Sequence, residues 1–216
     1  MLTLDSVFED IANSDVKAYT RYWKSIAPKN DDDILRRWLF AYTSIHTTWE
    51  SNVRGYNAIK NFDEWLHDRD LLLQKLIDAK CGMHNKRTEY IWDFAMEYLQ
   101  DPSKFHRLKN ESWTEMRNRL VKSCRGIGFA KVSFTLEMCY PDKAQVTCLD
   151  THMIQLYGID AAKFSSSNVT LYETHEADWI ERCKKAGCSP TIGRAIFWDR
   201  KQNQPDSRYW THVLEG

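Results

Sequence analysis

The 216-residue sequence has no long apolar run and no surplus of either charge. Its 30 Lys and Arg residues balance 30 Asp and Glu residues, which argues against a polybasic, histone-like binder and leaves only local basic surfaces. No segment is long and apolar enough for a membrane span, and the N-terminus lacks the basic start and apolar run of a signal peptide. These absences predict a cytoplasmic protein without a membrane partner.

Cysteine patterns for metal binding are also missing. The six cysteines form no C-x-x-C pair and no zinc-finger spacing, so the sequence predicts no metal site. Buried, reduced thiols in an intracellular protein are the expected state of these side chains.

Apolar residues recur along the chain at helical spacing. Apolar residues make up 43% of it and aromatic residues 13%, enough for a chain of this length to bury a core. No stretch alternates apolar and polar side chains for long enough to predict a strand. We expect an all-α protein of about ten helices, arranged as a single two-lobed domain that spans residues 1–216.

Local signals predict several helix ends. Ser-x-x-Glu at 112–115 and Thr-x-x-Glu at 170–173 are capping boxes for helix starts. Ser189-Pro190 supplies a cap and a first-turn proline for a further helix. Gly158 and Gly187 are typical of helix ends.

The most informative stretch is LVKSCRGIGFAK at 120–131, followed by CLDTH. It predicts a helix, a glycine hairpin and a second helix, and then a carboxylate, Asp150, that opens a third. Gly126 and Gly128 allow a tight turn where a Cβ would clash, and such turns point successive N–H groups outward to bind anions. Because residues 104–131 hold eight Lys or Arg against two Glu, a nucleic-acid backbone is the expected ligand.

Four collinear segments, the hairpin and its following Asp among them, resemble the helix-hairpin-helix DNA glycosylase superfamily, the fold of endonuclease III and 8-oxoguanine DNA glycosylase. GMHNKRTEYI at 82–91 is similar to the family's G-L/Y-x-N-x-K-A-x-x-I helix start. LFAYTSIHTT at 39–48 resembles the helix ending that carries the family's duplex-wedging residue. The resemblance covers roughly residues 30–160. It implies a two-lobed helical glycosylase fold, with the helix-hairpin-helix at about 112–140, and a monomer that acts on duplex DNA containing a damaged or modified base.

Asp150 is the first candidate for catalysis. From the residues alone, its carboxylate is either a plain N-cap or a fixed anion near a substrate. Cleavage of an N-glycosidic bond builds positive charge on the deoxyribose, which a fixed anion stabilises. The resemblance implies this second role, or activation of the attacking nucleophile, because family members use the matching Asp in these ways.

Lys131 is the second candidate. In bifunctional family members a Lys just after the hairpin attacks the sugar and forms a Schiff base. Alignment on the glycines puts Ala130 in that place and implies a monofunctional enzyme that uses water. Alignment on the Asp puts Lys131 there, because it lies 19 residues before Asp150, the separation typical of 8-oxoguanine glycosylases. A lysine that only contacts phosphate is the remaining alternative.

The resemblance also implies a set of DNA contacts. His46 matches the wedge that fills the space left by a flipped base, where an imidazole can stack and hydrogen-bond; an ordinary surface histidine is the alternative. Asn52, on the adjacent turn, could line the same site. The full set of expected DNA contacts is His46, Asn52, Asn85, Lys86, Arg125, Gly126, Ile127, Gly128 and Phe129.

Two cofactor expectations follow from the same resemblance. The family's hairpin holds a monovalent cation through backbone carbonyls, which implies such a site at 125–128. No iron–sulfur cluster is expected, because only Cys183 and Cys188 lie near the region where some members carry a four-cysteine loop.

The predicted function is base excision repair of DNA. The enzyme would flip out a damaged base, an 8-oxoguanine-like purine being favoured, and excise it either by hydrolysis or with an associated β-lyase step. Two alternatives stay open: a phage-type enzyme that hypermodifies a DNA base on the same fold, and a non-catalytic helix-hairpin-helix module that only binds DNA.

Overall fold

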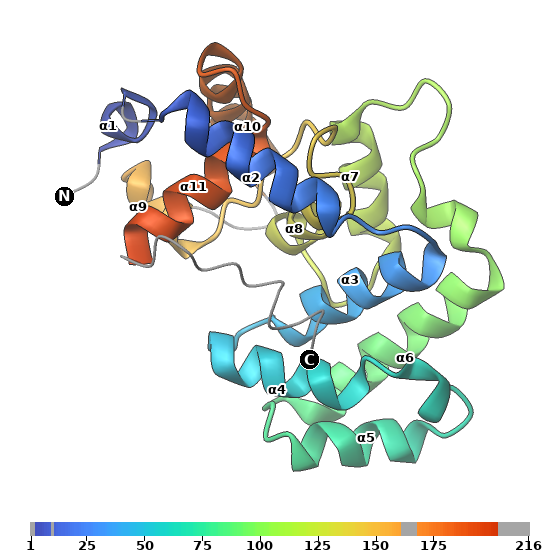
Figure 1. Cartoon of the computed structure of the whole chain (residues 1–216). Coiled ribbons are helices and arrows are strands. Elements are labelled where there is room, and N and C mark those ends of the chain that lie inside the picture. Colours follow the sequence, from blue (N-terminus) through green and yellow to red (C-terminus); the bar gives the residue numbers. More distant parts are fainter. Residues whose placement is uncertain (1–2, 10, 161–167, 203–216) are drawn as a thin grey trace. The chain divides into compact units, whose positions relative to one another are not determined.

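The computed structural model describes residues 3–9, 11–160 and 168–202. Within these ranges the chain forms eleven α-helices, two short 3-10 helices and no strand, so the prediction of an all-α protein is confirmed (Figure 1). The chain divides into two compact units. We call Pro28–Ile127 the central unit, and the described residues before Pro28 together with residues 128–202 the terminal unit.

The central unit is built around α3. Its helices are α3 (Asp31–Thr43), α4 (Trp49–Ile59), α5 (Arg69–Asp78), α6 (His84–Gln100) and α7 (Trp113–Ser123), with 3-10 helices at Phe62–Glu64 and Pro102–Phe105. Three consecutive Asp residues open α3 at the positive end of its dipole, and Asn30 caps the helix by accepting from the Asp33 N–H. α3 packs against α4 and α6, where the rings of Trp38 and Phe94 lie 5.0 Å apart.

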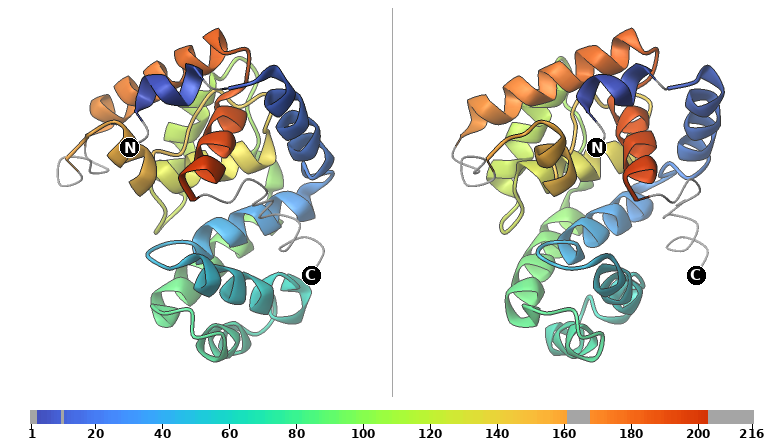
Figure 2. Two further views of the ribbon diagram at one scale, coloured as in Figure 1. Left: turned by 60° about the vertical axis from the view of Figure 1, so that its left-hand side comes forward. Right: turned by 90° about the vertical axis from the view of Figure 1, so that its left-hand side faces the viewer.

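The terminal unit joins segments from the two ends of the chain. Its helices are α1 (Leu4–Glu9), α2 (Asn13–Ser25), α8 (Phe129–Cys139), α9 (Thr151–Leu156), α10 (Val169–Lys185) and α11 (Pro190–Gln202). α11 packs against α2 and α10, and both views in Figure 2 show α1 alongside α10. Arg182 of α10 pairs with Asp5 of α1 at 2.8 Å. Beside this pair, Trp179 and Phe8 pack with ring centroids 4.9 Å apart.

Most of the predicted helix ends are confirmed. The capping box at 112–115 forms reciprocally at the start of α7, and Ser189 Oγ accepts from the Ile192 N–H at the start of α11. Gly158 and Gly187 follow the ends of α9 and α10 with φ of 63° and 72°. Such left-handed backbone is favourable for glycine and typical of helix C-termini.

The capping box predicted at 170–173 is wrong. Asn168 caps α10 instead, because its Oδ1 accepts from the Leu171 N–H, and Thr170 therefore lies inside the first helical turn. Asn is at least as favourable an N-cap as Thr, so the earlier residue takes the position.

The six cysteines are free thiols, of which five are buried and Cys188 is partly exposed. This confirms the expectation of reduced cysteines and leaves Cys188 as the accessible one. No helix in the described ranges combines the length and the apolar character that crossing a membrane requires.

Candidate active site

Asp150 forms the N-cap of α9. Its Oδ1 atom accepts hydrogen bonds from the backbone N–H groups of His152 (3.0 Å) and Met153 (3.1 Å). These groups have no acceptor inside the helix, so the carboxylate satisfies them at the positive end of the helix dipole. The N-cap role inferred from the sequence is confirmed. The side chain of Asp150 is still 19% exposed, so a substrate can approach it.

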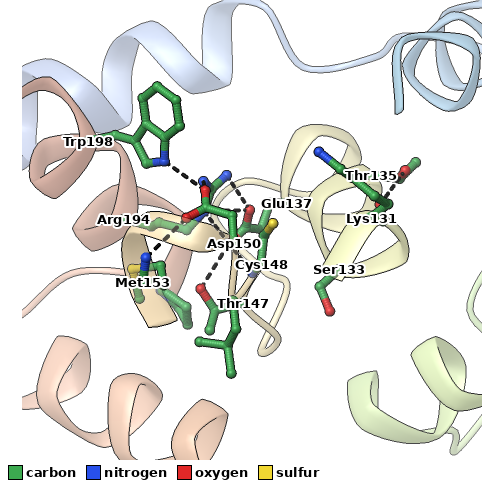
Figure 3. A network of polar contacts seen from close by, with 12 residues as sticks. Lys131, Ser133, Thr135, Glu137, Thr147, Cys148, Asp150, Met153, Arg194 and Trp198 are labelled. Atoms are coloured by element: carbon green, nitrogen blue, oxygen red, sulfur yellow. Dashed lines mark hydrogen bonds and ion pairs between the residues drawn. The ribbon is translucent and has the colours of Figure 1, made fainter. Parts of the chain in front are cut away.

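The second oxygen of Asp150 is held from α11 (Figure 3). Its Oδ2 atom accepts from Trp198 Nε1 at 2.8 Å and from Arg194 Nη1 at 3.4 Å. A carboxylate offers about four lone-pair positions, and here each oxygen has two donors. The orientation of Asp150 is therefore set by two helices, and its acceptor positions are all engaged.

Arg194 links Asp150 to a buried carboxylate on α8. Its Nε donates to both oxygens of Glu137 (3.0 and 2.8 Å), and its Nη2 lies 2.6 Å from Oε2. Burial raises the pKa of Glu137, and the Arg194 charge opposes that rise. Burial alone would lower the pKa of Arg194, but the neighbouring negative charges, that of Glu137 foremost, raise it above its usual value. One cation thus bridges two carboxylates, and its loss would leave an unpaired buried charge.

Glu137 also orders the chain that leads to Asp150. Its carboxylate accepts from the Thr147 hydroxyl at 3.0 Å and from the Cys148 N–H at 3.1 Å. Glu137 is fully buried, so these bonds are not in competition with water. The position of Asp150 therefore depends on a side chain of α8 as well as on α9 and α11.

Lys131 lies in the first turn of α8, in the same unit, and is half-buried. Its Nζ lies 5.6 Å from the centre of the Phe134 ring, and the Arg194 guanidinium lies 5.3 Å from the same centre. In Figure 3 the Lys131 side chain points toward the side on which Asp150 and Arg194 lie. An aromatic face attracts cations, so Phe134 holds both cationic side chains around one ring.

The buried thiol of Cys148 provides a second link between the two catalytic candidates. Burial raises the pKa of Cys148 to about 12; the Asp150 charge adds to the rise and the Lys131 charge opposes it. Both charges therefore lie close enough to act on one thiol. Ala130 occupies the preceding position on the same helical turn, so the choice between a lysine and a water nucleophile stays a prediction.

The two hairpin glycines differ in whether the fold requires a glycine at their position. Gly126 has φ of +80°, and a Cβ added there would lie 2.2 Å from the Tyr90 ring, so glycine is required by the fold. Gly128 has an ordinary extended backbone, φ −110° and ψ −176°, at the N-cap of α8. A Cβ added at Gly128 would meet no atom of the described residues within 4 Å. The expected clash is confirmed at Gly126 and wrong at Gly128, where the backbone borders open space.

The hairpin backbone has N–H groups that are available to bind a ligand. Among the described residues, no hydrogen bond uses the N–H groups of Gly126, Ile127 or Gly128. The side chains contribute less, because Ile127 is 6% exposed and the Phe129 ring packs 5.5 Å from the Tyr172 ring. Any DNA contact at these positions would therefore be made by the backbone.

Arg125 is exposed, but its charge is already paired. Its Nη1 lies 2.6 Å from Glu89 Oε1 and 3.6 Å from Asp93 Oδ2, and its guanidinium lies 5.5 Å from the centre of the Tyr90 ring. All three partners belong to α6. A DNA phosphate at this position would compete with two carboxylates.

The basic surface expected for residues 104–131 is smaller than the sequence indicates. Arg117 is 0% exposed, and Arg119 pairs with Glu111 at 2.6 Å. Counting charges along a chain shows neither their burial nor their partners. The local excess of cations therefore does not translate into an equal excess of positive surface.

The hairpin carbonyls fit a monovalent cation only in part. The Arg125 carbonyl accepts from the Tyr42 hydroxyl at 3.2 Å, and the Gly128 carbonyl accepts from the N–H groups of Lys131 and Val132. Two of the four carbonyls at 125–128 are thus engaged within the protein. The cation site stays a prediction.

His46 is exposed, in the loop between α3 and α4, with φ of +48°. The guanidinium of Arg87 binds this loop by donating to the carbonyls of Tyr42 (2.7 Å), Thr43 (2.9 Å) and Ile45. A non-glycine residue in left-handed backbone needs such support from its surroundings. The predicted wedge is thus an accessible side chain on a loop that is held in place.

The remaining predicted contacts also lie in the central unit. Asn85 and Lys86 are exposed on the first turn of α6, where they could reach a ligand. Asn52 is 3% exposed, and its Oδ1 atom has no hydrogen-bond partner within the described residues. Asn52 therefore offers almost no surface to DNA in this conformation.

Comparison with solved structures gives the same fold. The 8-oxoguanine DNA glycosylase of Thermotoga maritima superimposes with a TM-score of 0.70 over 89% of this chain and 92% of that protein, at 18% identity. That of Methanocaldococcus jannaschii superimposes with a TM-score of 0.67 over 92% and 90%, at 19% identity. No protein-family model and no curated protein sequence matches the chain. The chain has the fold of an 8-oxoguanine DNA glycosylase.

Within this glycosylase fold, three residues around Asp150 were not predicted from the sequence as part of the site: Glu137, Arg194 and Trp198. One signal was present, since Arg194 and Trp198 are four positions apart on a helix and therefore share a face. Nothing in the sequence indicates that this face meets the N-cap of α9.

Proposed function

We propose that this protein is a DNA glycosylase, which flips a damaged or modified base out of duplex DNA and cuts its N-glycosidic bond. The observation that carries the proposal is Asp150, a partly exposed carboxylate fixed by four donors, with Lys131 in the same unit. The fold shared with two 8-oxoguanine DNA glycosylases supports it.

The role of Asp150 in this proposal is electrostatic. As the base leaves, positive charge develops on the deoxyribose, and a fixed negative charge nearby lowers the energy of that state. Because four donors already occupy the carboxylate, it is poorly placed to remove a proton from an attacking group. The Arg194–Glu137 pair and the Trp198 indole would keep the carboxylate in position through the reaction.

We assign the nucleophile to Lys131 rather than to a water near Ala130. A carboxylate with no open acceptor position favours a nucleophile that needs no base from Asp150. The neutral Lys131 amine would attack C1′ as the C1′–N bond to the base breaks, and the base would leave with a proton that the amine gives up. Opening of the C1′–O4′ bond of the sugar, with O4′ taking a proton, would then give the imine. β-Elimination from that imine would release the 3′ phosphate, so the enzyme would be a lyase as well as a glycosylase.

We further propose an oxidised purine of the 8-oxoguanine type as the substrate base. The support is the name and activity of the two solved structures that share the fold. The duplex would be held at the hairpin, where the N–H groups of Gly126, Ile127 and Gly128 are not used within the described chain. Gly128 adds support, because the fold itself gives no reason for a glycine there.

The test is base release from duplexes that each carry one lesion, 8-oxoguanine first. The parent protein should release the free base from at least one duplex. Asp150→Asn should abolish release and leave DNA affinity within about tenfold, roughly 1.4 kcal/mol. Asn caps helices as well as Asp does, so thermal stability should change little. Asp142→Asn is the matched control, because Asp142 is an exposed carboxylate of the same unit whose one ion-pair partner among the described residues is Lys24.

Equal release by Asp150→Asn and the parent would refute the proposal. A large loss of thermal stability in Asp150→Asn would instead assign the charge of Asp150 to structural pairing with Arg194, because Asn keeps the cap. A base that is chemically changed but still attached to its sugar would identify the hypermodifying enzyme instead.

A further inference from the structure

A buried arginine in the central unit binds only backbone. Arg87 lies in the second turn of α6 and is 4% exposed. Within the described residues its guanidinium has no carboxylate partner; it donates instead to four carbonyls. Burial lowers the pKa of Arg87, as expected where no anion compensates the cost of burying a cation. A residue that served only to fill the core would not need this charge.

The four carbonyls belong to two separate segments. Three of them, at Tyr42, Thr43 and Ile45, lie at the end of α3 and in the loop that carries His46. The fourth is the Gly82 carbonyl, 3.0 Å from Arg87 Nε, in the turn before α6. A cation at the C-terminus of α3 is favourable because the helix dipole is negative there. One side chain thus ties the predicted wedge loop to the turn that leads to Asn85 and Lys86.

Both segments have backbone that needs such support. His46 has φ of +48° and Met83 has φ of +47°, left-handed values that cost a residue with a side chain free energy. Gly82, the residue before Met83, has φ of +65°. Conformations of this kind persist where the surrounding contacts over-determine them, and Arg87 provides contacts to both segments at once.

We propose that Arg87 is a positioning residue that holds the His46 loop and the Gly82–Met83 turn in one arrangement, so that the wedge and the Asn85–Lys86 contact meet the duplex together. The role in DNA binding that we assign to this arrangement rests on the proposed glycosylase function, whereas the arrangement itself does not. Arg87 itself touches no DNA, since its guanidinium is buried and its donors are engaged. Its effect should therefore fall on base flipping and hardly on DNA affinity.

The first experiment measures amide hydrogen exchange in the DNA-free protein. Arg87→Met, which keeps the side-chain length and removes the donors, should speed exchange at residues 44–48 and at 80–86 together. Arg87→Lys should speed it less, because an ammonium can reach some of the carbonyls but cannot span all four. Arg54→Met is the matched control: Arg54 is an exposed arginine of the same unit with one carbonyl acceptor, that of Ala79. Faster exchange at one segment only, or none, would overturn the positioning role.

The second experiment measures flipping with 2-aminopurine placed beside the lesion, in an Asp150→Asn background that cannot cleave. Arg87→Met and His46→Ala should each reduce the flipping signal about tenfold, with DNA affinity within about threefold. In the flipping signal the double variant should be no worse than His46→Ala, because Arg87 acts on flipping through the loop that carries His46. The turn before Asn85 and Lys86 should affect only the small change in DNA affinity. Additive losses, or normal flipping by Arg87→Met, would overturn the proposal.

The variants can be judged even if the most severe one does not fold. Arg87→Lys keeps the charge, and in that case both the exchange and the flipping measurement are made on this variant. Its flipping signal should lie between those of the parent and His46→Ala. A parent protein that releases no base from any lesion duplex would refute the proposed function alone, because the exchange measurement reads the positioning role without DNA.

Discussion

Trp198 donates its indole N–H to Asp150 Oδ2 at 2.8 Å, so the last described helix holds the N-cap of α9. The same ring meets the His152 ring edge-on, with centroids 4.9 Å apart and planes at 86°. His152 follows Asp150 by two positions and supplies one of its backbone donors. The carboxylate and its cap are thus braced by one aromatic side chain from α11.

Replacing Trp198 by Phe should separate this hydrogen bond from the packing of the ring. Trp198→Phe keeps an aromatic side chain against His152 and removes one donor from Asp150. The single-turnover rate of base release should fall about tenfold, roughly 1.4 kcal/mol, with DNA affinity unchanged. Trp113→Phe, on α7 of the central unit, is the control. An unchanged rate would mean that the two backbone donors and Arg194 suffice to hold the carboxylate.

Lys131 can be tested by trapping. If its amine attacks the sugar, borohydride added during turnover should reduce the imine and leave a covalent protein–DNA adduct. Lys131→Gln should lose the adduct and the strand nick together, yet still bind lesion DNA; the adduct is measured on a denaturing gel. Base release without an adduct in the parent would assign the attack to water at the Ala130 position. A normal adduct in Lys131→Gln would assign it to another amine.

The two hairpin glycines should respond differently to the same change. Gly126→Ala forces a side chain into left-handed backbone and against Tyr90, and should cost about 1–2 kcal/mol of unfolding free energy. Gly128→Ala meets no described residue within 4 Å and should change stability by less than about 0.5 kcal/mol. It should nevertheless weaken binding to all duplex sequences alike, since phosphate contacts carry no base readout. Thermal unfolding and fluorescence anisotropy measure the two effects, and unchanged binding by Gly128→Ala would remove the hairpin as a DNA anchor.

Thiol reactivity should separate two cysteines by pH. Hydrogen bonding with the Cys183 side chain lowers the pKa of Cys188, so the Cys188 thiolate is present at lower pH than in an ordinary cysteine. Burial raises the pKa of Cys148 to about 12, so its thiolate is absent until the pH approaches that value. As the pH is raised from neutral, iodoacetamide should modify Cys188 before Cys148, as followed by peptide mass spectrometry. Modification of both at the same pH would contradict this order.

Much of the fold could be predicted because the signals are local. The capping box at 112–115, the terminators Gly158 and Gly187 and the N-cap at Asp150 each depend on residues within one helical turn. The error at 170–173 has the same origin. Asn168 and Thr170 are both able to cap a helix, and local rules do not decide which of them does.

The sequence by itself determined the helical class, a glycine hairpin at 126–128, and a carboxylate at the start of α9. The tertiary structure decided what surrounds them. Asp150 is held by Trp198 from 48 positions away, Glu137 by Arg194 from 57, and the Tyr42 carbonyl by Arg87 from 45. Separations of this size follow from how helices pack rather than from any periodicity along the chain. Burial was equally hidden, since the sequence shows Asn52 and Arg117 as polar but not that both lie inside the protein.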